Sequence, residues 1–340
     1  MTGVLQSLWF RAAIVLAMLA LAVGTIWWRG PDWNSVYHAF DFVAWRWIAL
    51  AFVLNLLSVV LRSVSWRLTI GQALPPPEPP FPHVFSAFAV GLLGNAALPA
   101  RAGEVARVAV LRRHLDRGHG TSAALLGTVL AHRLFDLFPV ALLVAYVIRT
   151  AKIPHWAERG LWAFMIAGLV LLGVAIVGAR GRPAGDRGPE YHERRGAAAV
   201  RRLLATARTG LAVLRAPLPA AGAIVFQILG WFVQLLAVWS VTEAFEMDVG
   251  LPAAALVLLL MNIATIFPLW PGNFGLLQAA VALPLVQYGV AYGTGFAYGL
   301  ALQAIEMSVG VGVGLIFLAR EGMSMASLRS IRGVNSGGED

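Results

Sequence analysis

The stretch NAALPARAGEVARVAVLRR, residues 95–113, places charged side chains directly after a long apolar run. Its polar and turn-forming residues are Asn95, Pro99, Arg101, Gly103, Glu104 and Arg107. The proline and glycine predict that one helix ends here and that the next begins near Gly103. A helix start favours anions, and an arginine fork matches a phosphate. We therefore predict that Arg101 meets a lipid phosphate; alternatively, Arg101 and Glu104 pair only with each other and hold a hairpin together.

A second charged group interrupts the apolar segment around residue 135. His132, Arg133 and Asp136 recur at helical spacing, so one helix face is expected to carry an imidazole, a guanidinium and a carboxylate. The structural interpretation is an ion pair between Arg133 and Asp136. The functional interpretation makes Asp136 a counter-charge for a cationic headgroup or a proton carrier.

Further polar residues lie in the C-terminal half. The segment FPLWPGNFG breaks another apolar run, and the residues of interest at this second break are Pro271, Gly272, Asn273, Gly275 and Gln278. The amides of Asn95, Asn262 and Asn273 are expected to satisfy backbone groups freed at the two breaks. Glu306 stands alone within the last apolar stretch, where a carboxylate must face a partner or a cavity.

Composition assigns these groups to a membrane protein. Of 340 residues, 59% are hydrophobic and 13% are charged, whereas a soluble surface needs about 25% charged residues. The net charge of +9 comes almost entirely from arginines clustered between apolar runs, which indicates membrane topology and contact with anionic lipid and argues against nucleic-acid binding. With no cysteine, the chain has no disulfide and no thiolate metal site, and the spacing of the histidines predicts no metal or other cofactor.

The apolar runs predict an all-α polytopic membrane protein. A helix needs about 20 apolar residues to cross the hydrocarbon, and six segments qualify as full spans: 11–28, 46–66, 121–148, 160–179, 219–242 and 295–319. Residues 83–113 and 252–290 are broken in the middle and are predicted to be re-entrant hairpins. Such breaks are tolerated only where protein or a water-filled cavity covers them.

Arginine counts give the orientation. Nine arginines fall within residues 180–215, whereas the loop 243–248 carries acids and no lysine or arginine. The arginine-rich segment and both termini are therefore predicted to be cytoplasmic. The first hairpin then enters from the cytoplasm and the second from outside.

This opposition predicts an inverted repeat within a single membrane domain, residues 1–340. The units are 46–148 and 219–319; a cytoplasmic basic loop with an interfacial helix, 180–218, joins them, and a cytoplasmic tail, 320–340, follows. Paired interruptions in the two halves of a transporter point to a substrate site at the midplane.

Three motifs carry a family resemblance: GLLGNAALPARAGEVARVAVLRR at 91–113, HRLFDL at 132–137 and PGNFGLLQ at 271–278. They resemble the lysylphosphatidylglycerol synthase transmembrane-region family, flippase-like proteins whose best-known member carries aminoacylated phosphatidylglycerol across the bacterial inner membrane. The resemblance covers about residues 12–319, the membrane half of such proteins. His132 stands where the family usually has a glutamate, and Gln278 lies where an acid is expected.

The resemblance and the residues together predict a lipid translocase of the inner membrane. Its substrate would be an anionic or aminoacylated phospholipid, or a polyprenyl-phosphate-linked lipid, held at a midplane site. The alternative is an intramembrane enzyme or synthase partner in which His132 and Asp136 act as a base pair on a lipid-linked substrate. The chain has no GxSxG, HExxH or glycine-rich nucleotide motif, which argues against the enzyme. The expected partners are membrane lipids, with a separate lipid-modifying enzyme and a second copy of the chain left open.

The predicted topology is testable because the chain lacks cysteine. Single cysteines placed at Gly185 and Asp248 should react with a membrane-impermeant thiol reagent from opposite sides. Labelling of both positions from the same side would contradict the inverted repeat.

Overall fold

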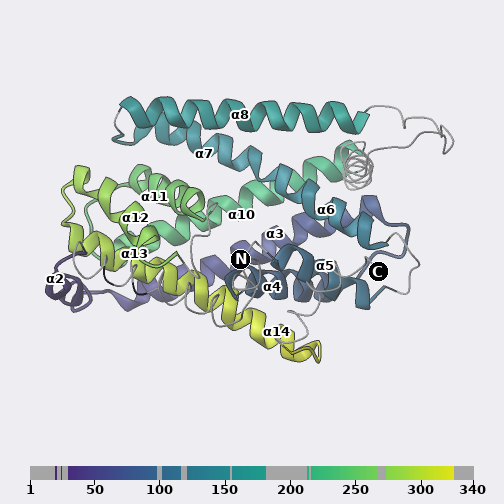
Figure 1. Cartoon of the computed structure of the whole chain (residues 1–340), viewed down its shortest axis with the longest axis horizontal. Helices are drawn as coiled ribbons and strands as arrows, with labels where there is room; N and C mark the ends of the chain where they lie inside the picture. The colour runs from purple at the N-terminus through teal and green to yellow at the C-terminus, as the bar shows by residue number, and fades with distance from the viewer. Residues whose placement is uncertain are drawn as a thin grey trace, which may run out of the picture.

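The computed structural model is a bundle of helices (Figure 1). It describes residues 20, 24, 30–97, 102–115, 121–153, 155–180, 213, 216–265 and 273–324, and this part of the chain contains no strand. The helices of the first half are α2 (Trp33–His38), α3 (Trp45–Ala73), α4 (Phe81–Ala97), α5 (Gly103–Arg113), α6 (Thr121–Phe135) and α7 (Leu137–Thr150). After α8 (His155–Arg180), the second half has α10 (Pro217–Ala244), α11 (Leu251–Ala264), α12 (Leu276–Leu285), a 3-10 turn (Val286–Tyr288), α13 (Tyr292–Met307), a π-helical segment (Ser308–Val313) and α14 (Gly314–Arg320).

The predicted polytopic membrane architecture is confirmed. Four stretches of the described chain are long and apolar enough to cross a bilayer: Trp45–Ala73, Thr121–Thr150, Pro217–Ala244 and Tyr292–Arg320. The predicted span 160–179 lies within α8, which runs alongside α7 in Figure 1. Apart from a few isolated residues, the predicted first span 11–28 and the predicted interfacial helix lie outside the described residues.

Two predicted spans are not single α-helices. The span 121–148 divides at Asp136 into α6 and α7. Pro139 explains the position of the break, because a proline provides no N–H for the carbonyl four residues earlier and its ring clashes with that group. The span 295–319 changes into a π-helix at Ser308–Val313. Both interruptions lie in the span that follows the hairpin in their half.

The two hairpins, α4–α5 and α11–α12, enter the bundle from opposite ends. At the base of the first hairpin, His114 Nε2 lies 2.7 Å from Glu321 Oε2, directly after α14. At the base of the second, the Tyr288 hydroxyl accepts a 2.7 Å hydrogen bond from the Lys152 backbone N–H, shortly before α13. The 29-residue span Tyr292–Arg320 therefore separates the two bases. In Figure 1, α11 and α12 accordingly lie to the left, and α4 and α5 lie further to the right.

Helices α3 and α10 form the antiparallel centre of the bundle. The Ala44 N–H donates to the Ala244 carbonyl at 2.9 Å, and the Ser58 hydroxyl donates to Gln234 Oε1, also at 2.9 Å. Further along, the Ser65 hydroxyl donates to the Ala223 carbonyl at 2.8 Å. Residue numbers rise along α3 as they fall along α10, so the opening helices of the two halves are in contact over most of their length.

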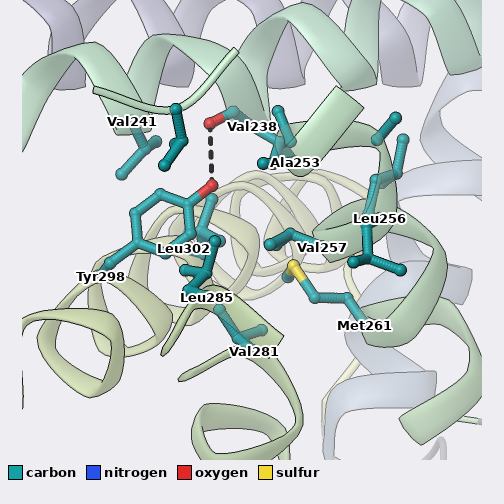
Figure 2. Close-up of a cluster of buried hydrophobic side chains, with 14 of the residues drawn as sticks. Val238, Val241, Ala253, Leu256, Val257, Met261, Val281, Leu285, Tyr298 and Leu302 are labelled. Carbon is teal, nitrogen blue, oxygen red and sulfur yellow. Dashed lines mark hydrogen bonds between the residues drawn. The ribbon is translucent and has the colours of Figure 1, made fainter. Parts of the chain in front are cut away.

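An apolar cluster fixes the second hairpin against α10 and α13 (Figure 2). The residues labelled there are Val238 and Val241 of α10, Ala253, Leu256, Val257 and Met261 of α11, Val281 and Leu285 of α12, and Tyr298 and Leu302 of α13. The Tyr298 hydroxyl donates to the Val238 carbonyl at 3.2 Å, so the polar end of this buried ring is satisfied. The cluster packs α11 and α12 of the second hairpin against α10 and α13.

A polar cluster joins the base of the first hairpin to the end of the last span. The His83 and His114 rings stack at 4.0 Å, and Ser86 donates to the other carboxylate oxygen of Glu321. Burial alone would raise the pKa of Glu321, but hydrogen bonds from Ser86 and His114 hold this pKa below its usual value. The carboxylate therefore stays ionised and links α4 and α5 to α14.

The first hairpin is closed by glycines. A Cβ added at Gly94 would lie 2.7 Å from Gly103 Cα, and one added at Gly91 would lie 3.0 Å from Arg107 Cβ. A Cβ added at Gly103 would overlap the Gly91 carbonyl oxygen. The α4 and α5 backbones can approach this closely only because no side chain stands between them.

We predict that Gly103→Ala separates α4 from α5 and lowers the thermal midpoint, because overpacking costs about 1–3 kcal/mol or more. The matched control is Gly173→Ala in α8, where an added Cβ meets nothing within 4 Å. Removing a glycine from an open helix position stabilises by about 0.5–1 kcal/mol, so the control should not melt earlier. Equal midpoints for the two variants in detergent would contradict the close packing.

Candidate functional site

A cavity of about 350 Å³ lies between the two halves of the bundle. The polar residues that line it from the first half are Asn55, Arg62, Asn95 and Arg133. Those from the second half are Gln234, Asn262, Thr265, Asn273, Gln303 and Glu306. Asn95 lies near the end of α4, and Thr265 and Asn273 flank the break between α11 and α12, so residues beside both hairpin tips face one cavity. The predicted tip residues Pro99, Arg101, Pro271 and Gly272 lie outside the described residues.

Glu104 anchors a charged cluster on the first-half side. It accepts a 2.9 Å hydrogen bond from Arg133 Nε and a second bond from Arg133 Nη2. Its other oxygen lies 2.5 Å from Arg107 Nη2. The hypothesis that Glu104 pairs only with Arg101 is therefore wrong: Arg107 lies one turn further along α5, and packing of α5 against α6 adds Arg133.

Asp136 joins three helices at the break between α6 and α7. Its carboxylate lies 3.3 Å from Arg133 Nη1 and 3.5 Å from Arg62 Nη2. It also accepts a 2.8 Å hydrogen bond from the Trp231 indole N–H and another from the Gln227 amide. The predicted ion pair of Arg133 with Asp136 is present. It belongs to a larger cluster that also ties α3 and α10 to the break.

Arg107 is buried away from the cavity, with a side chain 3% exposed. Its guanidinium lies 4.8 Å from the centre of the Trp66 ring and 5.4 Å from that of Phe88. Cation–π contact and the Glu104 ion pair compensate its burial. Arg107 therefore holds the first hairpin to α3 and does not contact the cavity.

His132 is not hydrogen-bonded to Asp136, its predicted partner at helical spacing. The ring is fully buried and meets the edge of Phe88 at 5.8 Å between ring centres. Neither ring nitrogen has a hydrogen-bond partner in the described part of the chain. No hydrogen bond joins His132 to Asp136, whose carboxylate is bound by Arg133, Arg62, Trp231 and Gln227.

The second break is held by amide side chains. Gln278 Oε1 accepts the Gly275 N–H at 2.7 Å and so satisfies the start of α12, while its amide donates to Gln303 of α13. The Asn273 amide donates to the Ala264 carbonyl at 3.0 Å. The backbone takes positive φ at Asn273 and Gly275, of 46° and 85°, which an asparagine and a glycine tolerate best.

These contacts agree with part of the sequence analysis. Asn262 and Asn273 satisfy backbone carbonyls, as predicted, because the Asn262 amide donates to the Leu258 carbonyl at 2.8 Å. Asn95 instead leaves its side-chain oxygen without a hydrogen-bond partner among the described residues. Glu306 lines the cavity.

Sequence reasoning missed Arg62, Gln303 and the donors to Asp136. The predicted span 46–66 ends four residues after Arg62, but α3 continues to Ala73, so Arg62 lies well before the helix end. Its position inside an apolar run was a usable signal, because an intramembrane arginine marks a functional site by default. The glutamines gave no such signal.

Comparison with known proteins identifies the family to which this chain belongs. The model of the lysylphosphatidylglycerol synthase transmembrane region matches residues 9–314. The chain belongs to this family. Among curated proteins, it is similar to a UPF0104 membrane protein of Methanothermobacter thermautotrophicus, at 23% identity over 84% of this chain and 85% of the relative. A second UPF0104 membrane protein of that organism is 24% identical over 67% of this chain and 72% of its own length. This match confirms the family resemblance that the three sequence motifs indicated.

We predict that Asp136→Asn destabilises the protein strongly. The change leaves Arg62 and Arg133 without their shared counter-charge, and losing one partner of a buried ion pair costs about 3–5 kcal/mol. The same substitution at the exposed Asp248 should alter stability by no more than about 0.5 kcal/mol. Thermal unfolding in detergent gives the comparison, and an Asp136→Asn midpoint equal to that of Asp248→Asn would show that the cluster does not stabilise the fold.

Proposed function

We propose that the protein is a lipid translocase that holds an anionic headgroup in the central cavity. The observation that carries the proposal is the pair of arginines, Arg62 and Arg133, on the wall of a polar cavity between two opposed hairpins. Arginine forks suit phosphate oxygens, and anionic phospholipids, aminoacylated phospholipids and polyprenyl-phosphate lipids share this group. Arg101 stays a predicted phosphate ligand.

The size of the cavity supports a headgroup as occupant. Small-molecule sites range from about 300 to 1,000 Å³, and the cavity, at about 350 Å³, lies at the lower end of that range. It has room for a phosphate and a small substituent but not for two acyl chains. The chains must then stay in the bilayer while the headgroup occupies the cavity.

The surface around the cavity suits those chains. A separate apolar cavity of about 240 Å³ lies between α7, α10 and α11 and is lined by Leu142, Phe232 and Leu258. Trp231 lines this cavity as well, and its ring faces the Arg62 guanidinium at 5.7 Å. Trp231 therefore borders both the apolar cavity and the Arg62 guanidinium.

The arrangement of the halves supports alternating access. In transporters built from inverted repeats, rocking of one half against the other exposes a midplane site to each side in turn. Here the cavity lies at the contact of the halves. We place the protein in the inner membrane with both termini cytoplasmic, on the arginine distribution.

The intramembrane enzyme is less well supported. That alternative required His132 and Asp136 to act together, but no hydrogen bond joins them and the His132 ring lies against Phe88. A role beside a separate lipid-modifying enzyme is compatible with translocation, because such an enzyme would supply the lipid.

Flipping of fluorescent phosphatidylglycerol in proteoliposomes tests the proposal, with dithionite quenching as the readout. Arg62→Lys keeps the charge beside Asp136 but loses the fork. Since a hydrogen bond to a charged group contributes about 1.5–3 kcal/mol, flipping should slow roughly tenfold or more, while the thermal midpoint changes little.

The control is Arg149→Lys, at the exposed end of α7. It should flip lipid at the wild-type rate. A wild-type protein that does not accelerate flipping, or an Arg62→Lys variant as fast as wild type, would contradict the proposal.

A further inference from the structure

Glu306 differs from the other carboxylates of the cavity region. It lies near the middle of the span Tyr292–Arg320 and lines the central cavity. Glu104 and Asp136 each contact two arginines within 4.0 Å, whereas Glu306 has no ion pair at that distance and no hydrogen bond among the described residues. A carboxylate in this position costs free energy as long as it stays charged and unpaired.

Arg62 contacts Asp136 and lines the same cavity as Glu306. Within the described part of the chain, its positive charge attracts the Glu306 carboxylate. Its contact with Asp136 is long, 3.5 Å, and its Nε has no hydrogen-bond partner in the described part of the chain. Asp136 has three other partners, so Arg62 can turn toward the cavity without leaving that carboxylate unpaired.

The charged groups of the cavity wall make anion binding depend on Glu306. In the described chain, α3 contributes Arg62 and α6 contributes Arg133. From α4, α10, α11 and the break between α11 and α12 the polar groups are uncharged amides and a hydroxyl. Glu104 and Asp136 balance two of the three charges of Arg62, Arg107 and Arg133, so one positive charge is left in the cluster. An ionised Glu306 offsets that charge and competes with an anion for Arg62, whereas a protonated Glu306 leaves it to the anion.

We propose that Glu306 binds a proton together with the anionic headgroup, so that the proton gradient can drive or bias lipid movement. A proton from the aqueous phase forms an O–H bond with one carboxylate oxygen as the headgroup phosphate engages Arg62. On the other side of the membrane, the proton leaves to water, the carboxylate attracts Arg62, and the headgroup is released. This inference rests on the proposed translocase and supplies its coupling step.

The backbone beside Glu306 is suited to such a change. The π-helical segment Ser308–Val313 begins two residues later, and wide turns of this kind are frequent at functional sites. An added Cβ at Gly310 would have its nearest neighbour at 4.0 Å, and one at Gly312 would meet nothing within 4 Å. The segment therefore has room to rewind and to move the Glu306 carboxylate relative to Arg62.

The first experiment measures fluorescent phosphatidylglycerol flipping in proteoliposomes under an imposed pH gradient. In wild type, a gradient acid on the side where the lipid starts should speed flipping, and reversing the gradient should slow it. Glu306→Gln mimics the neutral carboxyl group and should flip at one rate under both gradients. Glu246→Gln, in the exposed turn after α10, should behave as wild type. Wild-type flipping that ignores the gradient overturns the proposal while leaving the translocase intact.

The second experiment does not depend on transport. Infrared difference spectra of the purified protein between acid and alkaline pH should contain a protonated carboxyl band that Glu306→Gln lacks and Glu246→Gln retains. Its presence supports a proton site even in a protein that moves no phosphatidylglycerol, in which case the translocase fails instead. Spectra of wild type and Glu306→Gln that are identical in this band would overturn the proton site.

Discussion

The structure depends on neutralising charge inside the membrane. Three arginines and two carboxylates, Arg62, Arg107, Arg133, Glu104 and Asp136, are packed together within helices that are otherwise apolar. Any one of them alone would cost several kcal/mol at that depth. Their mutual contacts require α3, α5, α6 and α10 to meet at fixed positions. Two features of the backbone allow these contacts. Helices α4 and α5 approach closely at Gly91, Gly94 and Gly103, and the break between α6 and α7 lies at Asp136.

The same constraint separates two roles for arginine. Arg107 is enclosed by Trp66, Phe88 and Glu104 and holds the first hairpin in place. Arg62 and Arg133 share their carboxylate partners and still face the cavity. A cation that is balanced on one side and open on the other can bind an anion without being left uncompensated when the anion departs. The charged cluster thus supports the cavity wall and leaves it able to bind a ligand.

The sequence predicted where the hairpin helices break better than it predicted which side chains contact one another. Proline and glycine mark the hairpin tips because they act on the local backbone, and α5 begins at Gly103, as predicted. Partners on other helices depend on how those helices pack, so the Glu104 contact to Arg133 could not be predicted, whereas Arg107 lies at i+3 on the same helix and helical spacing could have indicated it. The break at Asp136 was missed because the apolar run continues through Pro139. Arg62 was missed because the span predicted from hydropathy ends at residue 66, whereas α3 continues to Ala73. Gln278 stands where an acid was expected. Its side-chain oxygen accepts the Gly275 N–H, and its amide donates to Gln303.

The central claim is that the cavity between the hairpins receives a lipid headgroup from water-accessible space. Because the chain has no cysteine, a single Asn262→Cys variant reports on the cavity wall alone, and Glu246→Cys in the exposed turn after α10 serves as a control. The rate of modification by a small charged thiol reagent should be measured with and without short-chain phosphatidylglycerol. The account predicts that the cysteine at position 262 reacts and that the lipid slows its reaction, with no effect of lipid at position 246. A cysteine at position 262 that reacts at the same rate with and without the lipid would contradict it.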